Sequence, residues 1–259
     1  MQSYIDLGNP VSDHPLNRGL AGWWLPLPNN QGGSKLFDLT GHGNHGTLTI
    51  SPTWAGVLNG FGALQFSGAN YVNVPYAANL KAAGQTYSGM VRPETTDQYQ
   101  FPIATYTSNA DGLEVFFENG TGVRWGSFDV KTAAYTVSLG AWAHVVGTIT
   151  AAGGLELYVN GVSRATAAGC GYTGASNTAP LTIGARNGGG VYGLRGRVQS
   201  MAVHNRVVSA SEAAALYHQA QRDYPDLLRR WSRRIYSFAA VAAAGGLTRG
   251  KLLLMGCGG

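Results

Sequence analysis

The sequence is poor in cysteine and in long apolar runs, and each shortage excludes a class of protein. Cys170 and Cys257 are the two cysteines. They are too few for a disulfide framework, and their spacing matches no zinc motif. No run reaches the roughly 18 apolar residues of a membrane span. The first residues lack a basic segment followed by an apolar one, so the chain as given has no secretory signal. We expect it to be made in a cytosol.

Charge is scarce as well, and it is unevenly distributed. Charged residues make up 12% of the chain, and the formal net charge is +5. From Arg222 onward there are seven basic and two acidic residues, which account for the whole excess, whereas the first 221 residues balance. We therefore expect an electrically neutral body with a basic C-terminal tail. A neutral body argues against specific nucleic-acid binding.

Glycine is abundant, with 38 residues, and aromatic residues make up 10% of the chain. From Gly22 to about His204, short apolar and aromatic segments alternate with Gly, Asn and Pro, a rhythm typical of β-sandwiches. Residues 155–159 (LELYV) alternate in polarity and are followed by Asn160 and Gly161, a pair typical of a tight hairpin turn. The pattern predicts an all-β protein.

A short helix is expected to close this β-rich region. Ser209 and Glu212 have the spacing of a capping box, and apolar residues follow at helical spacing. In residues 222–259, an apolar stripe flanked by arginines predicts a basic amphipathic helix, followed by a Gly- and Ala-rich apolar tail. Such a helix can lie on a membrane, contact nucleic acid or dock on an acidic groove of a protein, and we expect docking on a partner protein. The expected partner-binding residues are Leu227, Leu228, Arg229, Arg230, Trp231, Arg233, Arg234, Ile235 and Phe238.

Five segments between about residues 16 and 219 carry landmarks in a fixed order. They read GLAGWWLPL, FDLTGHGNHGTL, GALQFSGANYVNVP, WAHVVGTITAAGGLELYVNGV and LTIGARNGGGVYGLRGRVQSMAVHNRVVSASEAAALY. In this order they resemble the laminin-G-like jelly rolls of the concanavalin A-like lectin and glucanase superfamily. The resemblance implies two antiparallel sheets, with ligands on the concave face or at the rim loops. Members include lectins, adhesive modules, hydrolases and viral surface proteins, so the function stays open.

The resemblance also implies a place for structural calcium, although no cofactor is expected to be required. Many relatives have an Asp in the segment that reads FSGANY here, where this chain has Ser67 and Asn70. Asp38 is the carboxylate nearest to these motifs in the sequence, and calcium prefers charged oxygen ligands. Asp38 is therefore the candidate metal ligand. The interpretation that we favour is that Asp38 is buried and caps the turn that follows it.

A glycoside hydrolase is the enzymatic alternative, since such enzymes use two nearby carboxylates. Glu114 and Glu118 would share one strand face, but at about 3.3 Å per residue they would lie about 13 Å apart, which is too far. The run from Gly41 to Gly46, GHGNHG, matches a dinucleotide fingerprint in letters only, because a strand is expected after it where the fingerprint needs a helix. We predict no catalytic residue and no enzyme.

Sugar binding would use exposed aromatic and amide side chains, which stack on sugar rings and hydrogen-bond to hydroxyl groups. The candidates, all in or beside expected loops, are Tyr99, Tyr106, Asn109, Trp125, Asn187 and Tyr192. The competing interpretation is that the aromatic residues of a sandwich fill its core.

Together these patterns predict an N-terminal arm (1–15), a jelly-roll domain (16–221) and an anchoring tail (222–259). We expect a non-enzymatic structural protein of a virion surface, such as a capsid decoration, fibre or tail component. It would be made in the host cytoplasm, form homo-oligomers, dock on other subunits and bind cell-surface glycans. The alternative is a soluble lectin-like or adhesion module that reaches the cell surface by non-classical export.

Overall fold

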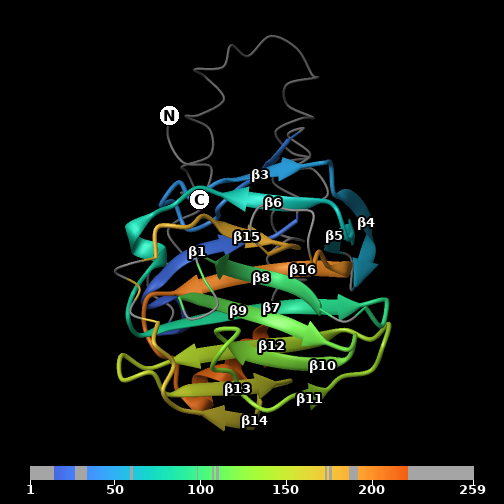
Figure 1. Ribbon diagram of the computed structural model, residues 1–259. Helices are drawn as coiled ribbons and strands as arrows, with labels where there is room; N and C mark the ends of the chain where they lie inside the picture. Colours follow the sequence, from blue (N-terminus) through green and yellow to red (C-terminus); the bar gives the residue numbers. More distant parts are fainter. Residues whose placement is uncertain are drawn as a thin grey trace, which may run out of the picture. The chain divides into compact units, whose positions relative to one another are not determined.

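Two eight-stranded antiparallel sheets, packed face to face, form the described part of the chain (Figure 1). The computed structural model describes residues 15–26, 34–58, 61–97, 99–106, 108, 111–172, 174, 177–186 and 192–220. Sheet A has the order β14-β13-β12-β7-β16-β5-β4, with β1 also paired to β16. Sheet B has the order β11-β10-β9-β8-β15-β6-β3-β2. The expected two-sheet, jelly-roll-like sandwich is confirmed.

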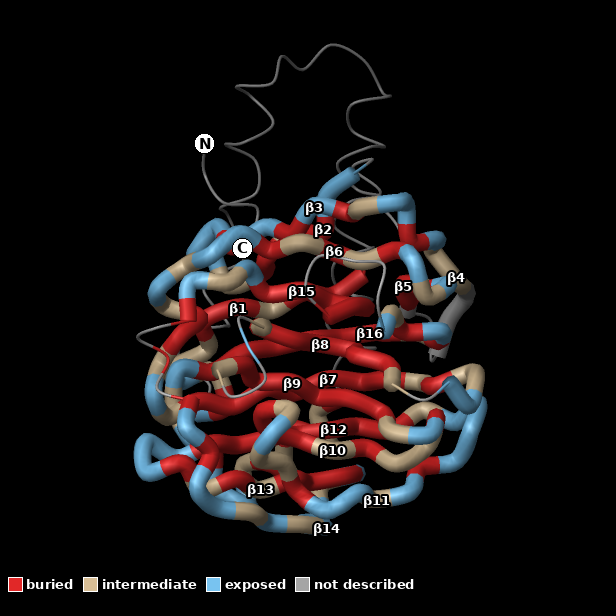
Figure 2. The backbone as a smooth tube through the Cα atoms, viewed as in Figure 1, coloured by how far each residue is buried: buried red, intermediate tan, exposed pale blue. Residues whose placement is uncertain are grey.

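The described strands are short, as the spacing of turn residues predicted. They are β1 (Leu20–Trp24), β2 (Lys35–Leu36), β3 (Gly46–Thr49), β4 (Thr53–Leu58), β5 (Phe61–Ser67), β6 (Tyr71–Val74), β7 (Gln85–Pro93), β8 (Tyr99–Tyr106), β9 (Gly112–Glu118), β10 (Gly122–Gly126), β11 (Tyr135–Thr136), β12 (Ala143–Ile149), β13 (Leu155–Val159), β14 (Val162–Ala167), β15 (Leu181–Ile183) and β16 (Arg195–His204). The described helical segments are the 3-10 turns η1 (Pro15–Asn17) and η2 (Ala78–Leu80) and an α-helix over 210–220. Figure 2 shows that the central strands are buried and that exposed residues gather in turns.

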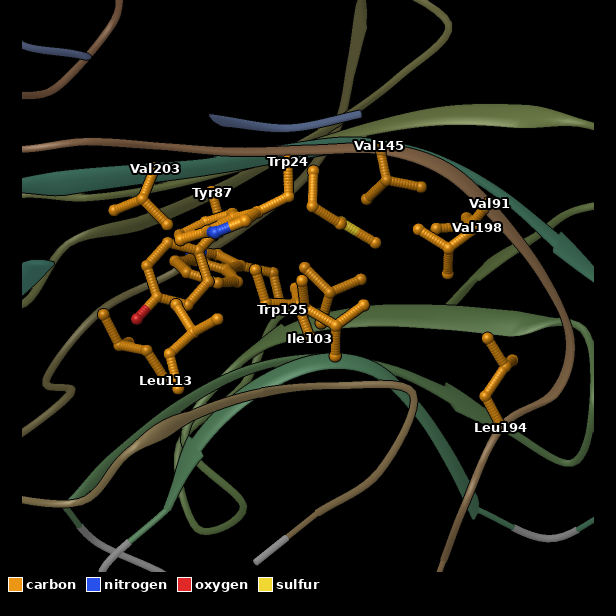
Figure 3. Close-up of a cluster of buried hydrophobic side chains, with 14 of the residues drawn as sticks. Trp24, Tyr87, Val91, Ile103, Leu113, Trp125, Val145, Leu194, Val198 and Val203 are labelled. Atoms are coloured by element: carbon orange, nitrogen blue, oxygen red, sulfur yellow. The ribbon is translucent and has the colours of Figure 1, made fainter. Parts of the chain in front are cut away.

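Apolar side chains from both sheets fill the space between them (Figure 3). Trp24 of β1 and Tyr87 of β7 come from sheet A, and Trp125 of β10 and Ile103 of β8 come from sheet B. All four are at most 1% exposed. Every second residue of these strands faces this core, because successive side chains of a strand point to opposite faces.

Trp125 belongs to this core, so the expectation of a ligand-binding Trp125 beside a loop is wrong. Its Nε1 donates a hydrogen bond to the carbonyl oxygen of Thr148 at 2.8 Å. Its ring meets that of Tyr87 edge-on at 5.2 Å between centroids. A Cβ on Gly147 would come within 2.2 Å of the Trp125 ring, so only glycine leaves room for it. Strand alternation decides the outcome, since Arg124 takes the outer face and Trp125 the inner one.

Both local motifs expected from the sequence are present. Asn160 and Gly161 have φ angles of 51° and 77° and join β13 to β14 in a tight hairpin. The backbone N–H of Ser209 donates to Glu212 Oε2 at 2.8 Å, and the N–H of Glu212 donates to Ser209 Oγ at 3.3 Å. These reciprocal bonds make the capping box at the start of the helix over 210–220. The β13 alternation predicted a half-buried strand, but Tyr158 on its second face is 3% exposed.

The closing helix covers Tyr158, because it packs on the outer face of sheet A. A second apolar cluster forms there from Leu16, Val146, Tyr158, Val208, Ala213 and Leu216. Two histidines are buried beside it: His204 Nε2 hydrogen-bonds to the carbonyl oxygen of Leu16 at 2.9 Å, and the ring of His144 lies 6.0 Å from that of Tyr217. Burial lowers the pKa of both histidines to about 4.

A buried lysine holds together the segments that enter β9 and β15. Lys81 is 6% exposed, and its Nζ donates to Asn177 Oδ1 at 3.0 Å. Asn177 Nδ2 in turn donates to the carbonyl oxygen of Asp111 at 3.1 Å. Burial lowers the pKa of Lys81 to about 7, although the nearby charge of Asp111 opposes the shift. These bonds fix the start of β9, which carries part of the candidate site.

The chain divides into two compact units, Met1–His218 and Gln219–Gly259. The expected domain boundaries near residues 15 and 221 stay predictions. The expected partner-binding residues from Leu227 to Phe238 lie outside the described residues. Within the described ranges, no helix combines the length and the apolar character needed to cross a membrane.

Removal of the Trp125 ring is expected to lower the free energy of unfolding by about 3–5 kcal/mol, the usual cost of truncating a large core aromatic residue. Urea unfolding of Trp125→Ala measures the loss. Tyr76→Ala is the control, because Tyr76 is 48% exposed and should shift the unfolding free energy by about 0.5 kcal/mol or less. Equal stabilities of the two variants would contradict a core role for Trp125.

Acid is expected to destabilise the fold through His144 and His204. Their pKa values fall from 6.5 to about 4 on folding, so the folded state excludes protons that the unfolded chain binds. The stability that they contribute is complete above pH 6.5 and is lost as the pH falls towards 4, by up to about 3 kcal/mol for each histidine. The free energy of unfolding in urea is measured at a series of pH values for the parent protein and for the double variant that carries both His144→Gln and His204→Gln. A double variant with an equally steep loss of stability between pH 6.5 and 4 would refute this origin.

Candidate functional site

The outer face of sheet B carries side chains that alternate with those of the core. In β9, Val115 faces the core, so its neighbours Glu114 and Phe116 face outward. On β8, Phe101 and Ala104 join Phe116 in an apolar cluster separate from the main core. Phe101 and Phe116 have no exposed surface, so further side chains must cover this face.

Those covering side chains are largely aromatic. The rings of Phe101 and Phe116 stack with centroids 5.3 Å apart. Tyr99 meets Phe128 and Tyr192 edge-on, each at 5.5 Å. Phe128 comes from the turn between β10 and β11, and Tyr192 from the segment before β16. Together with Tyr106 at the end of β8, these six residues are called the aromatic cluster below.

Arg186 occupies the middle of the aromatic cluster. Its guanidinium carbon lies 3.8 Å from the ring centroid of Tyr106, 4.7 Å from that of Phe128 and 5.2 Å from that of Phe101. Its Nε donates to Glu114 Oε1 at 2.6 Å. The side chains of Arg186 and Glu114 are 8% and 0% exposed, so this is a buried ion pair inside an aromatic shell.

Local structure after β15 brings Arg186 to this position. The chain turns at Gly184, which has a φ of 89° and lies so close to the Phe66 ring that a Cβ would come within 2.2 Å of it. The hydroxyl of Thr182 lies 2.6 Å from the carbonyl oxygen of Ala185 and donates to it. The turn therefore needs glycine at 184, and it returns Arg186 over the outer face of the sheet.

Burial dominates the chemistry of Glu114. It raises the pKa of this carboxyl to about 7, because the loss of hydration outweighs the favourable charges of Arg186 and Lys131. Glu114 Oε2 has no hydrogen-bond partner among the described residues. The carboxylate thus depends on a single arginine contact, and its charge is easily lost.

A second ion pair lies beside the first on the same face. Arg124 Nε donates a hydrogen bond to Glu118 Oε2 at 2.6 Å, and Arg124 Nη2 lies at the same distance from this oxygen. Arg124 Nη1 also donates to the carbonyl oxygen of Thr132 at 2.9 Å. Glu118 lies opposite Tyr99 in the β8–β9 pairing, so this pair borders the aromatic cluster. Each carboxylate of β9 is therefore held by its own arginine.

The structure gathers three of the six residues expected to bind a ligand. Tyr99, Tyr106 and Tyr192 belong to the aromatic cluster, and Tyr192 is 45% exposed. Trp125 lies in the core instead. Asn109 and Asn187 lie outside the described residues.

Sequence reasoning missed Phe101, Phe116, Phe128 and Arg186 as parts of this site. The alternation of β9 held the signal: the run LEVFFE puts Glu114 and Phe116 on one face and Val115 and Phe117 on the other. Arg186 had no such signal, because it follows β15 in a turn and reaches β9 only through the sheet pairing.

Asp38 caps its own turn, as the favoured interpretation held. Its Oδ1 accepts the N–H groups of Trp23 and Thr40 at 3.1 and 3.0 Å, and its Oδ2 accepts that of Asn44 at 3.0 Å. The hydroxyl of Thr40 lies 2.8 Å from Oδ1. A calcium ligand needs these lone pairs free, so Asp38 does not fit the calcium site that the resemblance implied.

The FSGANY segment offers no replacement for Asp38. Asn70 Oδ1 accepts the N–H of Ser67 at 2.8 Å and so closes its own turn. No group of three His, Cys, Asp or Glu side chains able to hold a metal ion is found within the residues that the structure describes.

Comparison with known proteins supports the same fold. The family model of the concanavalin A-like lectin/glucanases superfamily matches residues 66–214. No curated protein sequence matches the chain. Domain 4 of the extracellular arabinanase AbnA of Geobacillus stearothermophilus, solved with arabinotriose, has a TM-score of 0.61 at 16% identity. That match covers 76% of this chain and 98% of the domain.

Two further similar structures are larger than this chain. Trypanosoma rangeli sialidase in complex with sialic acid has a TM-score of 0.60 at 19% identity, over 79% of this chain and 33% of the sialidase. The binding domain of botulinum neurotoxin DC in complex with SialylT has a TM-score of 0.59 at 13% identity, over 80% of this chain and 53% of that domain. The chain thus spans a third of one and about half of the other. At these identities the likeness concerns the fold.

Proposed function

The chain belongs to the concanavalin A-like lectin/glucanase superfamily, and from this membership we propose that it is a non-enzymatic glycan-binding protein. The binding site is the aromatic cluster on the outer face of sheet B. The observation that carries the proposal is the aromatic cluster itself: Tyr192 contacts Tyr99 edge-on, Tyr106 lies against Arg186, and Tyr192 is 45% exposed.

Aromatic rings held in place by their neighbours suit the apolar faces of sugar rings. Tyr192 contacts Tyr99 edge-on, and Phe101 lies 6.2 Å away between centroids, so its ring is held in a defined orientation. A preformed ring surface loses little conformational freedom on binding. The hydroxyl groups of the tyrosines can hydrogen-bond to the sugar. The arabinotriose and sialic acid named for the similar structures agree with a glycan as the ligand.

The state of the two β9 carboxylates supports binding rather than hydrolysis. Glycosidases use two carboxyl groups about 5 to 9.5 Å apart across the scissile bond. Glu114 and Glu118 are four residues apart on one strand, which corresponds to about 13 Å. Each is also ion-paired at 2.6 Å, to Arg186 and to Arg124. The spacing of the two carboxyl groups and their ion pairs therefore favour binding over hydrolysis.

Replacement of Tyr192 by alanine is expected to weaken glycan binding by about tenfold or more, because a stacked aromatic contact adds about 1 kcal/mol beyond its buried area. Ligands are first identified by glycan-array screening of the full chain, and affinities are then measured by calorimetry. Tyr76→Ala is the matched control, since Tyr76 is 48% exposed and lies outside the aromatic cluster. Absence of any glycan ligand, or equal affinities of the two variants, would rule the proposal out.

We also propose that residues 222–259 anchor the chain in a larger assembly, such as a virion surface. The support is the uneven charge: this segment carries the whole net charge of +5, while the rest of the chain is balanced. A basic segment with an apolar stripe suits an acidic or apolar groove on a partner subunit.

The full chain is therefore expected to sediment with assembled particles, and a chain ending at Gln221 is expected to stay in the supernatant. Particles from the source of the protein are separated by density-gradient centrifugation, and the chain is detected by immunoblot. The shortened chain must keep the thermal unfolding midpoint of the full chain, which shows that the sandwich is intact. If the full and the shortened chain are incorporated into particles equally, residues 222–259 do not act as the anchor.

A further inference from the structure

We propose that the Glu114–Arg186 pair sets the charge preference of the site, so that the parent protein selects neutral glycans over glycans that carry a carboxylate. This inference rests on the proposed glycan-binding function and names its ligand class. The Nε–Oε1 distance of 2.6 Å is the observation behind it, together with the burial of both side chains in the aromatic cluster.

An arginine with a buried internal partner is a poor receptor for a second carboxylate. A sugar acid at Arg186 would compete with Glu114, and it would bring a second negative charge next to a carboxylate that is 0% exposed. Like charges at short range in a poorly hydrated site repel strongly. A neutral sugar meets no such repulsion, because its hydroxyl groups and C–H faces need only hydrogen bonds and ring surfaces.

The other charged groups near the cluster are engaged as well. Arg124 is paired to Glu118 at 2.6 Å. The Nζ of Lys131 donates to the carbonyl oxygen of Phe128 at 2.7 Å and lies 4.6 Å from the centroid of its ring. Arg124 and Lys131 therefore each already have a partner on this face, which makes them poor receptors for an anionic sugar.

The pair should therefore act as a specificity switch. Glu114→Gln keeps the shape of the side chain and removes its negative charge, which leaves the charge of Arg186 uncompensated by its β9 partner. Glu114→Gln together with Arg186→Gln restores neutrality at the same place. Glu156→Gln changes the net charge of the chain by the same amount as Glu114→Gln, but Glu156 lies on β13 in sheet A, where it accepts a hydrogen bond from Ser163.

The test measures, by calorimetry on the full chain, the affinity ratio for a matched pair of oligosaccharides that differ in one carboxylate, at a pH well above the pKa of about 7 of the Glu114 carboxyl, so that this group is charged. The parent and Glu156→Gln are expected to bind the neutral oligosaccharide at least about tenfold more tightly than the acidic one, which is the scale of one charged interaction. Glu114→Gln should reduce or reverse this ratio, and the double variant should restore it. Thermal unfolding verifies that each variant is folded, and the parent ratio is informative even if a variant does not fold.

Each other outcome has a separate meaning. A parent that prefers the acidic glycan overturns the charge preference but leaves glycan binding intact. If Glu114→Gln leaves the ratio of neutral to acidic affinity unchanged, the Glu114–Arg186 pair does not set the preference. The same conclusion follows if Glu156→Gln changes that ratio as much as Glu114→Gln does. Absence of binding to neutral and acidic glycans alike overturns the proposed function itself.

Discussion

The carboxylate of Glu114 has no exposed surface and one strong ionic contact, and the outer face of sheet B is arranged around that constraint. A buried carboxylate loses its hydration, and an opposite charge offsets this loss only at close range and in a good geometry. Arg186 supplies that charge, and its planar guanidinium lies against the rings of Phe101, Tyr106 and Phe128. The ion pair and the aromatic rings therefore form one unit: the rings exclude water from the pair, and the pair holds the rings in place.

The two sheets use their outer faces differently. The outer face of sheet A is covered by η1 and the closing helix, under which His144 and His204 are buried as neutral side chains. The outer face of sheet B has no such helix among the described residues, and short turns bring Phe128, Arg186 and Tyr192 over it. A sheet covered by turns can expose selected aromatic rings while its strands stay rigid, which is the arrangement that a preformed binding surface needs.

Interactions between residues close in the sequence could be predicted, and those across the sheets could not. The hairpin at Asn160 and Gly161 and the capping box of Ser209 and Glu212 are set by the conformational preferences and hydrogen bonds of neighbouring residues. Trp125 was misassigned because its place depends on which face of β10 meets the core, and on the room that Gly147 leaves on another strand. The residues near Trp125 in the sequence give no sign that Gly147 will lie against its ring.

The sequence by itself determined the all-β fold class, its local turns and caps, the turn-capping interpretation of Asp38, and the contrast between a neutral body and a basic tail. These depend on composition and on residues a few positions apart. Only the tertiary structure decided which aromatic residues are exposed and that Glu114 meets Arg186, 72 residues further along the chain. The physical reason is that a strand has two equivalent faces, and only the pairing and stacking of distant strands give one face to the core and the other to a site.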